Sequence, residues 1–126
     1  MKMLLLIQSC ALLVKIDLMI RLRALQSIHT LVRNSRVSVR MSHDKLDITT
    51  ICRAMDLACV LYIKPVLCLQ RSAATALLLR RYGWRSEMVI GAQVIPFKSH
   101  AWVEVEGTVV NDKPYMHEIY CVLERC

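Results

Sequence analysis

The chain has 126 residues, of which 56% are hydrophobic and 21% are charged, a composition typical of one folded domain. Three glycines and three prolines are too few for a collagen-like, linker-rich or low-complexity protein. The formal net charge is +7 at pH 7. Residues 1–43 hold seven Lys and Arg against one acidic residue, Asp17, whereas residues 44–126 hold ten basic and nine acidic groups. We therefore expect a nearly neutral body with a basic N-terminal segment.

The basic, apolar N-terminal segment suits three environments, which the sequence leaves open. These are an acidic protein partner, weak contact with an anionic membrane surface, and solvent around an ordinary helix face. Nucleic acid is not an expected partner, because the basic residues are dispersed and no recognition motif surrounds them.

The apolar run at residues 3–14 bears on the location of the protein. It is shorter than the roughly 20 residues that a transmembrane helix needs, and it lacks the cleavage site of a secretory signal. We therefore expect no transmembrane segment and a cytoplasmic location. The cysteines form no CxxC motif and no paired framework, which agrees with reduced thiols in the cytosol; they stand at positions 10, 52, 59, 68, 121 and 126.

Leucines at helical spacing dominate the first part of the chain. Residues 3–33 are predicted to form one or two helices that end near Asn34 and Ser35. The expected organisation is an N-terminal helical, basic segment at residues 1–46, which packs on a core formed by residues 47–126 within a single domain.

A further helix is predicted after a polar linker at residues 42–45. Asp47 is its expected N-cap, because a carboxylate there can accept a hydrogen bond from a free backbone N–H. Cys52 and Cys59 lie seven residues apart on the apolar face of this helix, and core packing explains them better than metal binding.

Pro65 separates that helix from the next one, since proline disfavours helical geometry in the residue before it. The next helix is predicted to run from about Cys68 to Arg81, with Gly83 as its C-terminal stop. Its several alanines allow neighbours to approach closely, so this helix is expected to be central and buried.

The hydrophobic period then changes from helical to two. Strands are predicted at residues 87–94, 99–105, 108–112 and 119–123. Helices followed by an antiparallel meander make an α+β fold.

Cys68 is the cysteine best suited to chemistry. At the start of a helix it lies beside unpaired N–H groups and a partial positive charge, which favour the nucleophilic thiolate over the thiol. Arg71 adds positive charge one turn further along. The other five cysteines lack this setting.

Two residues on the predicted strands complete a possible catalytic set. His100 begins the strand HAWVEV, and an imidazole beside a cysteine can take its proton and later protonate a leaving amine. Asp112 ends the next strand, where a carboxylate can orient the histidine. Trp102 faces the same side as His100 and is expected to wall the site against water.

The turn between these strands tests the arrangement. A three-residue turn at residues 105–107, with Gly107 in the left-handed conformation, would pair His100 with Asp112 on one face. A two-residue turn would place Asp112 opposite Ala101 and send His100 to the other face. The catalytic interpretation therefore predicts an odd turn or a bulge.

Each of these residues also has an ordinary structural explanation. A cysteine at a helix start is usually a core residue, a histidine on a strand is usually structural, and an aspartate at a strand end usually forms a turn. Their combination in this order favours chemistry. His29 and His43 are predicted to be surface residues, and His117 is a weaker rival base. No zinc-like spacing exists, so neither a metal nor another cofactor is expected.

Six short motifs give the sequence its family resemblance. They are CLQRS at residues 68–72, LRRYG at 79–83, VIG at 89–91, PF at 96–97, HAWVEV at 100–105 and ND at 111–112. Over roughly residues 47–113 the chain resembles the transglutaminase-like cysteine peptidases of lasso-peptide biosynthesis, the leader peptidases called B proteins. HAWVEV is shared with wider transglutaminase-like proteins, and the other motifs indicate the narrower family.

The resemblance implies a papain-like fold and a Cys–His–Asp triad carried by Cys68, His100 and Asp112. It implies hydrolysis of one bond in a ribosomally made precursor, which releases the leader peptide and frees an amine that an ATP-dependent lasso cyclase then joins to an acidic side chain. Only residues 1–46 precede the peptidase part, so the chain resembles the split form, which relies on a separate leader-recognition protein. Gln70 and Trp102 are candidate substrate-binding residues, and the backbone N–H of Cys68 is a candidate oxyanion donor.

Two other functions stay open from the sequence. A transglutaminase-like acyltransferase would pass the acyl group to an amine instead of water. A non-catalytic scaffold would use its apolar N-terminal helices to hold a partner, and its six thiols would react at similar, slow rates.

Overall fold

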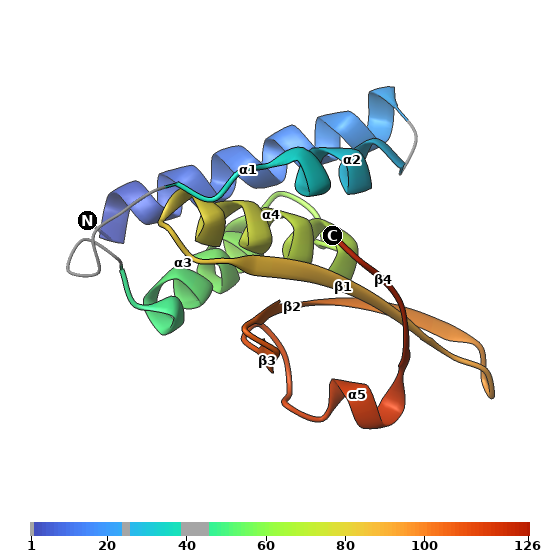
Figure 1. Cartoon of the computed structure of the whole chain (residues 1–126). Helices are drawn as coiled ribbons and strands as arrows, with labels where there is room; N and C mark the ends of the chain where they lie inside the picture. The colour runs from blue at the N-terminus through green and yellow to red at the C-terminus, as the bar shows by residue number, and fades with distance from the viewer. Residues whose placement is uncertain (1, 24–25, 39–45) are drawn as a thin grey trace.

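The computed structural model of the chain describes residues 2–23, 26–38 and 46–126. The elements follow in the order α1 (Lys2–Leu22), α2 (Gln26–Asn34), α3 (Ile48–Leu61), α4 (Cys68–Arg81), β1 (Ser86–Gln93), β2 (Lys98–Val105), β3 (Thr108–Val109), α5 (Met116–Ile119) and β4 (Cys121–Arg125). The four longer helices lie on one side of the sheet and α5 lies on the other (Figure 1). The expected α+β class is confirmed, and residues 3–33 form two helices.

The four strands form one antiparallel sheet with the order β3-β2-β1-β4. The predicted meander is wrong in its last step, because β4 returns to pair with β1 instead of β3. This order, with the fourth strand beside the first, is that of a Greek key. β3 pairs only with the last two residues of β2, so the beginning of β2 has no strand beside it on that side within the described residues.

Helix α4 is the centre of the structure. Ten of its fourteen residues are buried, and it packs against α1, α3, β1 and β2. Small side chains at Ala73, Ala74 and Ala76 are fully buried, which lets these neighbours approach the helix closely. The helix ends as predicted at Gly83, whose φ of 91° is open to glycine. The N–H of Trp84 donates to the Leu79 carbonyl at 3.0 Å, which closes the helix end.

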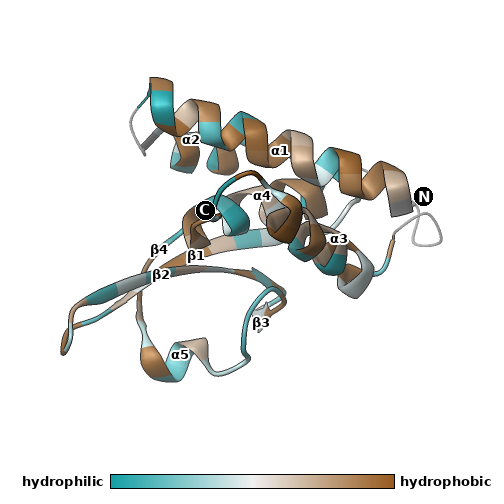
Figure 2. Cartoon of the chain, turned by 180° about the vertical axis from the view of Figure 1, so that it is seen from behind, coloured by the Kyte–Doolittle hydropathy of each residue, from teal (hydrophilic) through white to brown (hydrophobic). Residues whose placement is uncertain are grey.

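Helix α1 covers α3 and α4 with one apolar face and leaves apolar side chains on its other face (Figure 2). Its inner residues belong to the same hydrophobic core as α4; they are Leu5, Leu12, Leu13 and Ile16. The helix extends beyond the apolar run at residues 3–14, through Lys15 and Asp17 to Leu22, and ends within the predicted helical range of residues 3–33. By length and composition alone, Met3–Leu22 could cross a membrane, and one third of its most apolar stretch is buried against the protein.

Asp17 is a charged residue on the buried side of α1. Its carboxylate accepts a hydrogen bond from Lys64 Nζ at 2.6 Å and lies near Arg21 and Tyr62. The hydrogen bond from Lys64 lowers the pKa of Asp17 despite the opposing effect of burial. This carboxylate therefore joins α1 to the chain between α3 and α4.

Two local predictions fall near α3. Asp47 stands at the N-cap position, but its side chain makes no capping hydrogen bond, so that part of the prediction is wrong. The predicted linker at residues 42–45, with His43, lies outside the described residues. Cys52 is buried and Cys59 packs against the core, as expected.

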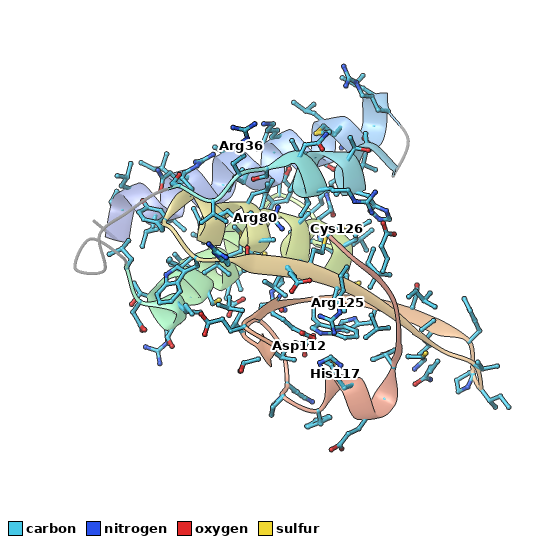
Figure 3. All side chains as sticks on the ribbon, in the orientation of Figure 1. Arg36, Arg80, Asp112, His117, Arg125 and Cys126 are labelled. Carbon is cyan, nitrogen blue, oxygen red and sulfur yellow. The ribbon has the colours of Figure 1, made fainter. Side chains whose placement is uncertain are left out.

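A buried arginine, Arg80, joins the end of α4 to α2, to the start of β1 and to Cys126. Arg80 is 6% exposed, and burial lowers its pKa. Its guanidinium donates to the carbonyls of Ser86 at 2.8 and 3.1 Å, of Cys126 at 2.8 Å, and of Val32. It lies on the helical side of the sheet, close to the C-terminal Cys126 (Figure 3).

We expect Arg80→Met to lower the free energy of unfolding by about 3 kcal/mol, because it leaves several buried carbonyls without a donor. Chemical denaturation with circular dichroism measures the change. Arg85→Met removes an exposed arginine nearby and should cost less than about 0.5 kcal/mol. Equal losses in the two variants would contradict the role given to Arg80.

Candidate active site

Cys68 is the first residue of α4, as the sequence predicted, and its side chain is exposed. The helix start directs its free N–H groups toward the space around the thiol. Cys68 therefore combines access with the polar environment that a nucleophile needs, whereas Cys52 is buried and burial raises the pKa of its thiol to about 11.

His100 and Asp112 meet directly. His100 Nε2 donates a hydrogen bond to Asp112 Oδ2 across 2.6 Å, and both side chains are about one-quarter exposed or less. A carboxylate can only accept, so this bond places the ring proton on Nε2 and leaves Nδ1 as the acceptor. Nδ1 has no hydrogen-bond partner in the described part of the chain, and it is the atom that could take a proton from a thiol.

A buried hydroxyl brings α4 to this pair. Ser72 lies one helical turn after Cys68, and its Oγ donates to the Ala101 carbonyl, next to His100, at 3.0 Å. The same Oγ accepts from the side-chain amide of Asn111, next to Asp112, at 3.2 Å. The chain neighbours of His100 and Asp112 are thus both bonded to the first turns of the helix that carries Cys68.

No hydrogen bond joins Cys68 to His100 within the described residues. The contact between thiol and imidazole therefore stays a prediction. Such contacts are often loose in a protein without substrate and shorten in the reacting complex.

The turn between β2 and β3 differs from the predicted one. It has two central residues, Glu106 and Gly107, with φ of 52° and 79°, and Val105 pairs with Thr108. The predicted three-residue turn is wrong, although the left-handed Gly107 is confirmed. Positive φ at both positions is the geometry of a tight hairpin turn.

The chain leaves the strand before Asp112, and this is why His100 and Asp112 still meet. β3 stops at Val109, and the side-chain Oδ1 of Asn111 takes the place of a strand carbonyl by accepting from the Val103 N–H at 2.7 Å. The bend crosses the open edge of β2, so strand alternation no longer decides the direction of Asp112. The predicted pairing through strand alternation is wrong, because β3 ends at Val109 and does not extend to Asp112.

Aromatic rings surround His100. Its ring centroid lies 5.3 Å from that of Tyr120 and 6.2 Å from that of Trp102. Trp102 is fully buried, which agrees with shielding of His100 from water; its contact with substrate stays a prediction. Tyr120 was not predicted from the sequence, because it lies outside the matching motifs and reaches the site only when β4 returns beside β1.

Gln70 faces the interior at the start of α4. It is 4% exposed, its Oε1 accepts from the Leu67 N–H at 3.1 Å, and its Nε2 donates to Asp17 at 3.3 Å. Both ends of the amide are thus used within the protein, and the role of Gln70 in substrate binding stays a prediction.

A second carboxylate lies beneath the aromatic rings. Glu104 is 1% exposed, and it accepts from Trp102 Nε1 at 2.8 Å and from Arg125 at 2.9 Å. His117 Nε2 lies 2.7 Å from it. Figure 3 shows Asp112, His117 and Arg125 on the α5 side of the sheet. His117, the rival base, therefore contacts Glu104 and has no bond to Cys68.

The other histidine that the structure describes is His29, which was predicted to be a surface residue. Its side chain is partly exposed, and its Nδ1 lies 3.3 Å from Glu124 on β4. Within residues 2–23, 26–38 and 46–126, no group of three or more His, Cys, Asp or Glu side chains could hold a metal ion.

Opposing effects act on the pKa of Asp112. Burial raises it, but hydrogen bonds from His100 and the Lys113 N–H, together with the positive charges of His100 and Arg71, lower it below the usual 3.8.

The lowered pKa predicts how Asp112 affects stability. Ionised Asp112 adds stability above the unfolded-state pKa, and this contribution is lost as the pH falls through the lower folded-state pKa. We expect the difference in unfolding free energy between wild type and Asp112→Asn to shrink below about pH 4. Urea unfolding at several pH values measures it, with the exposed Glu118→Gln as the control. An equal difference at neutral and acidic pH would contradict this prediction.

Comparisons with known proteins show which family the chain belongs to. The sequence model of the transglutaminase-like superfamily matches residues 11–125. The chain is similar to the microcin J25-processing protein McjB of Escherichia coli, with 41% identity over 56 residues. This segment is 44% of the chain and 27% of McjB. No solved structure matches significantly. Because the family match spans nearly all of the fold described above, the chain belongs to the transglutaminase-like superfamily.

Proposed function

We propose that this protein is a cysteine peptidase that hydrolyses the leader from a ribosomally made lasso-peptide precursor. The observation that carries the proposal is the 2.6 Å bond between His100 and Asp112, joined through Ser72 to the helix that begins at Cys68. A nucleophile, a base and a group that orients the base are the parts that acyl transfer through a thioester needs.

The proposed reaction has two steps. The Cys68 thiolate attacks the carbonyl carbon of the last leader residue, and the peptide C–N bond breaks as His100 protonates the departing amine of the core peptide. His100 then removes a proton from water, which attacks the thioester and releases the leader acid and the free thiol. Asp112 holds the His100 ring and stabilises its cationic form. The backbone N–H of Cys68 is the candidate donor to the oxyanion.

The similarity to McjB supports the choice of substrate. That relative is described as processing microcin J25, and the chain also carries the motifs that resemble lasso leader peptidases. The matching segment covers about a quarter of McjB, so the substrate and partners of the present protein are part of the proposal. The partners are the precursor peptide, a separate leader-recognition protein and a lasso cyclase.

A cytoplasmic location is also part of the proposal. All six cysteines are free, which suits a reducing cytoplasm, where the precursor is made.

An acyltransferase is the second candidate, because the same thioester could react with an amine instead of water. The mass of the product separates the two reactions. Hydrolysis gives a leader with a free carboxyl group, whereas transfer gives a leader joined to the amine.

We expect Cys68→Ala to lower the rate of leader release by at least about a thousandfold while the fold survives. His100→Ala should be comparably inactive, because the thiol then lacks its base. Asp112→Asn should be less impaired, since the base is still present. Mass spectrometry of precursor peptides incubated with the protein and its leader-recognition partner measures the release.

Cys121→Ala is the matched control, since it removes an exposed cysteine on β4 and should leave cleavage unchanged. Normal cleavage by Cys68→Ala would rule out the proposed nucleophile. Circular dichroism of each variant separates a lost function from a lost fold.

A further inference from the structure

We infer that Tyr120 is a positioning residue that, together with Trp102, fixes the rotation of the His100 ring. The inference rests on the proposed function, because the ring matters as the base that activates Cys68. It adds Tyr120, which lies between α5 and β4, to the candidate active site. The other residues of this site come from α4, β2 and the bend after β3.

The bond to Asp112 alone cannot fix the ring. It holds Nε2 at one point, 2.6 Å from the carboxylate, and the ring can still turn about that contact. Such a turn would change the direction of Nδ1, the atom that takes the thiol proton in the proposed function. A second contact, against the flat face of the ring, is needed to keep Nδ1 in one direction.

Tyr120 and Trp102 supply this contact. The ring of His100 is within 27° of parallel to Tyr120 and within 29° of parallel to Trp102. The centroids of Tyr120 and Trp102 are themselves 6.0 Å apart. The three centroid distances are similar, so the three rings form one cluster in which His100 packs against the other two. We call the rings of Tyr120 and Trp102 the aromatic platform.

Gly91 makes room for the platform. It pairs with His100 on β2 and with Val122 on β4. A Cβ at this position would lie 2.7 Å from the Trp102 ring and 2.8 Å from the Tyr120 Cβ, closer than carbon atoms pack. The glycine is therefore required here for its missing side chain.

The platform is anchored on both sides. Glu104 accepts from the Trp102 indole at 2.8 Å, which fixes the plane of that ring. The Tyr120 N–H donates to the Met116 carbonyl at 2.9 Å, which fixes the backbone at the end of α5. Tyr120 is partly exposed, whereas Trp102 is fully buried, so Tyr120 can be changed with less risk to the core.

The test is the alkylation rate of Cys68 by iodoacetamide, followed by mass spectrometry of the Cys68 peptide across a pH series. We expect Tyr120→Leu to slow the reaction near neutral pH by about tenfold, because a displaced imidazole no longer assists the thiol. Tyr120→Phe keeps the ring and should restore the rate to within about threefold of wild type. Tyr115→Leu removes a nearby exposed tyrosine and should change nothing.

Three outcomes would overturn the inference. A wild-type rate in Tyr120→Leu, with a slow His100→Ala, would show that His100 acts without Tyr120. An equal loss in Tyr120→Phe would assign the effect to the hydroxyl group instead of the ring. A wild-type alkylation rate of Cys68 in His100→Ala would contradict the proposed function, and therefore also this inference. If Tyr120→Leu does not fold, Tyr120→Met preserves the bulk without the flat ring and takes its place.

Discussion

The arrangement of the candidate site depends on one buried hydroxyl group. Ser72 is 1% exposed, and its Oγ bonds both β2, through Ala101, and the bend after β3, through Asn111. Leaving a buried polar group unpaired costs about 1–3 kcal/mol, so these bonds are strongly favoured together. They hold β2 and the bend after β3, both far from α4 in the sequence, at the beginning of that helix.

Two carboxylates, those of Asp112 and Glu104, each hold one aromatic ring of the candidate site. Asp112, partly exposed, holds the imidazole of His100, whereas the buried Glu104 holds the indole of Trp102. Burial raises the pKa of Glu104, but the hydrogen bonds from Arg125 and Trp102, with the charges of Arg125 and His117, lower it overall. The lowered pKa favours the ionised form of Glu104 beside the Trp102 ring, whereas the proposed function assigns proton transfer to the outer pair, His100 and Asp112.

Contacts in the helical half of the protein hold α4, the helix that carries Cys68, in place. Arg80 at the end of α4 gathers the carbonyls of α2, β1 and the C-terminus, and Asp17 on α1 joins the chain before α4 through Lys64. Both charged groups lie among apolar side chains, where an unpaired charge is costly. The position of α4, and with it that of Cys68, is thus fixed at both ends of the helix.

The sequence by itself determined the α+β class, the helix that starts at Cys68 and stops at Gly83, and the strand that carries His100. These features follow from local periodicity and from residues with special backbone preferences. It also predicted the pairing of His100 with Asp112, although for the wrong reason. Only the tertiary structure decided the two-residue turn, the bend at Asn111 and the return of β4 that brings Tyr120 to His100. These features depend on bonds between segments far apart in the chain, and such bonds leave no periodic signal in the sequence.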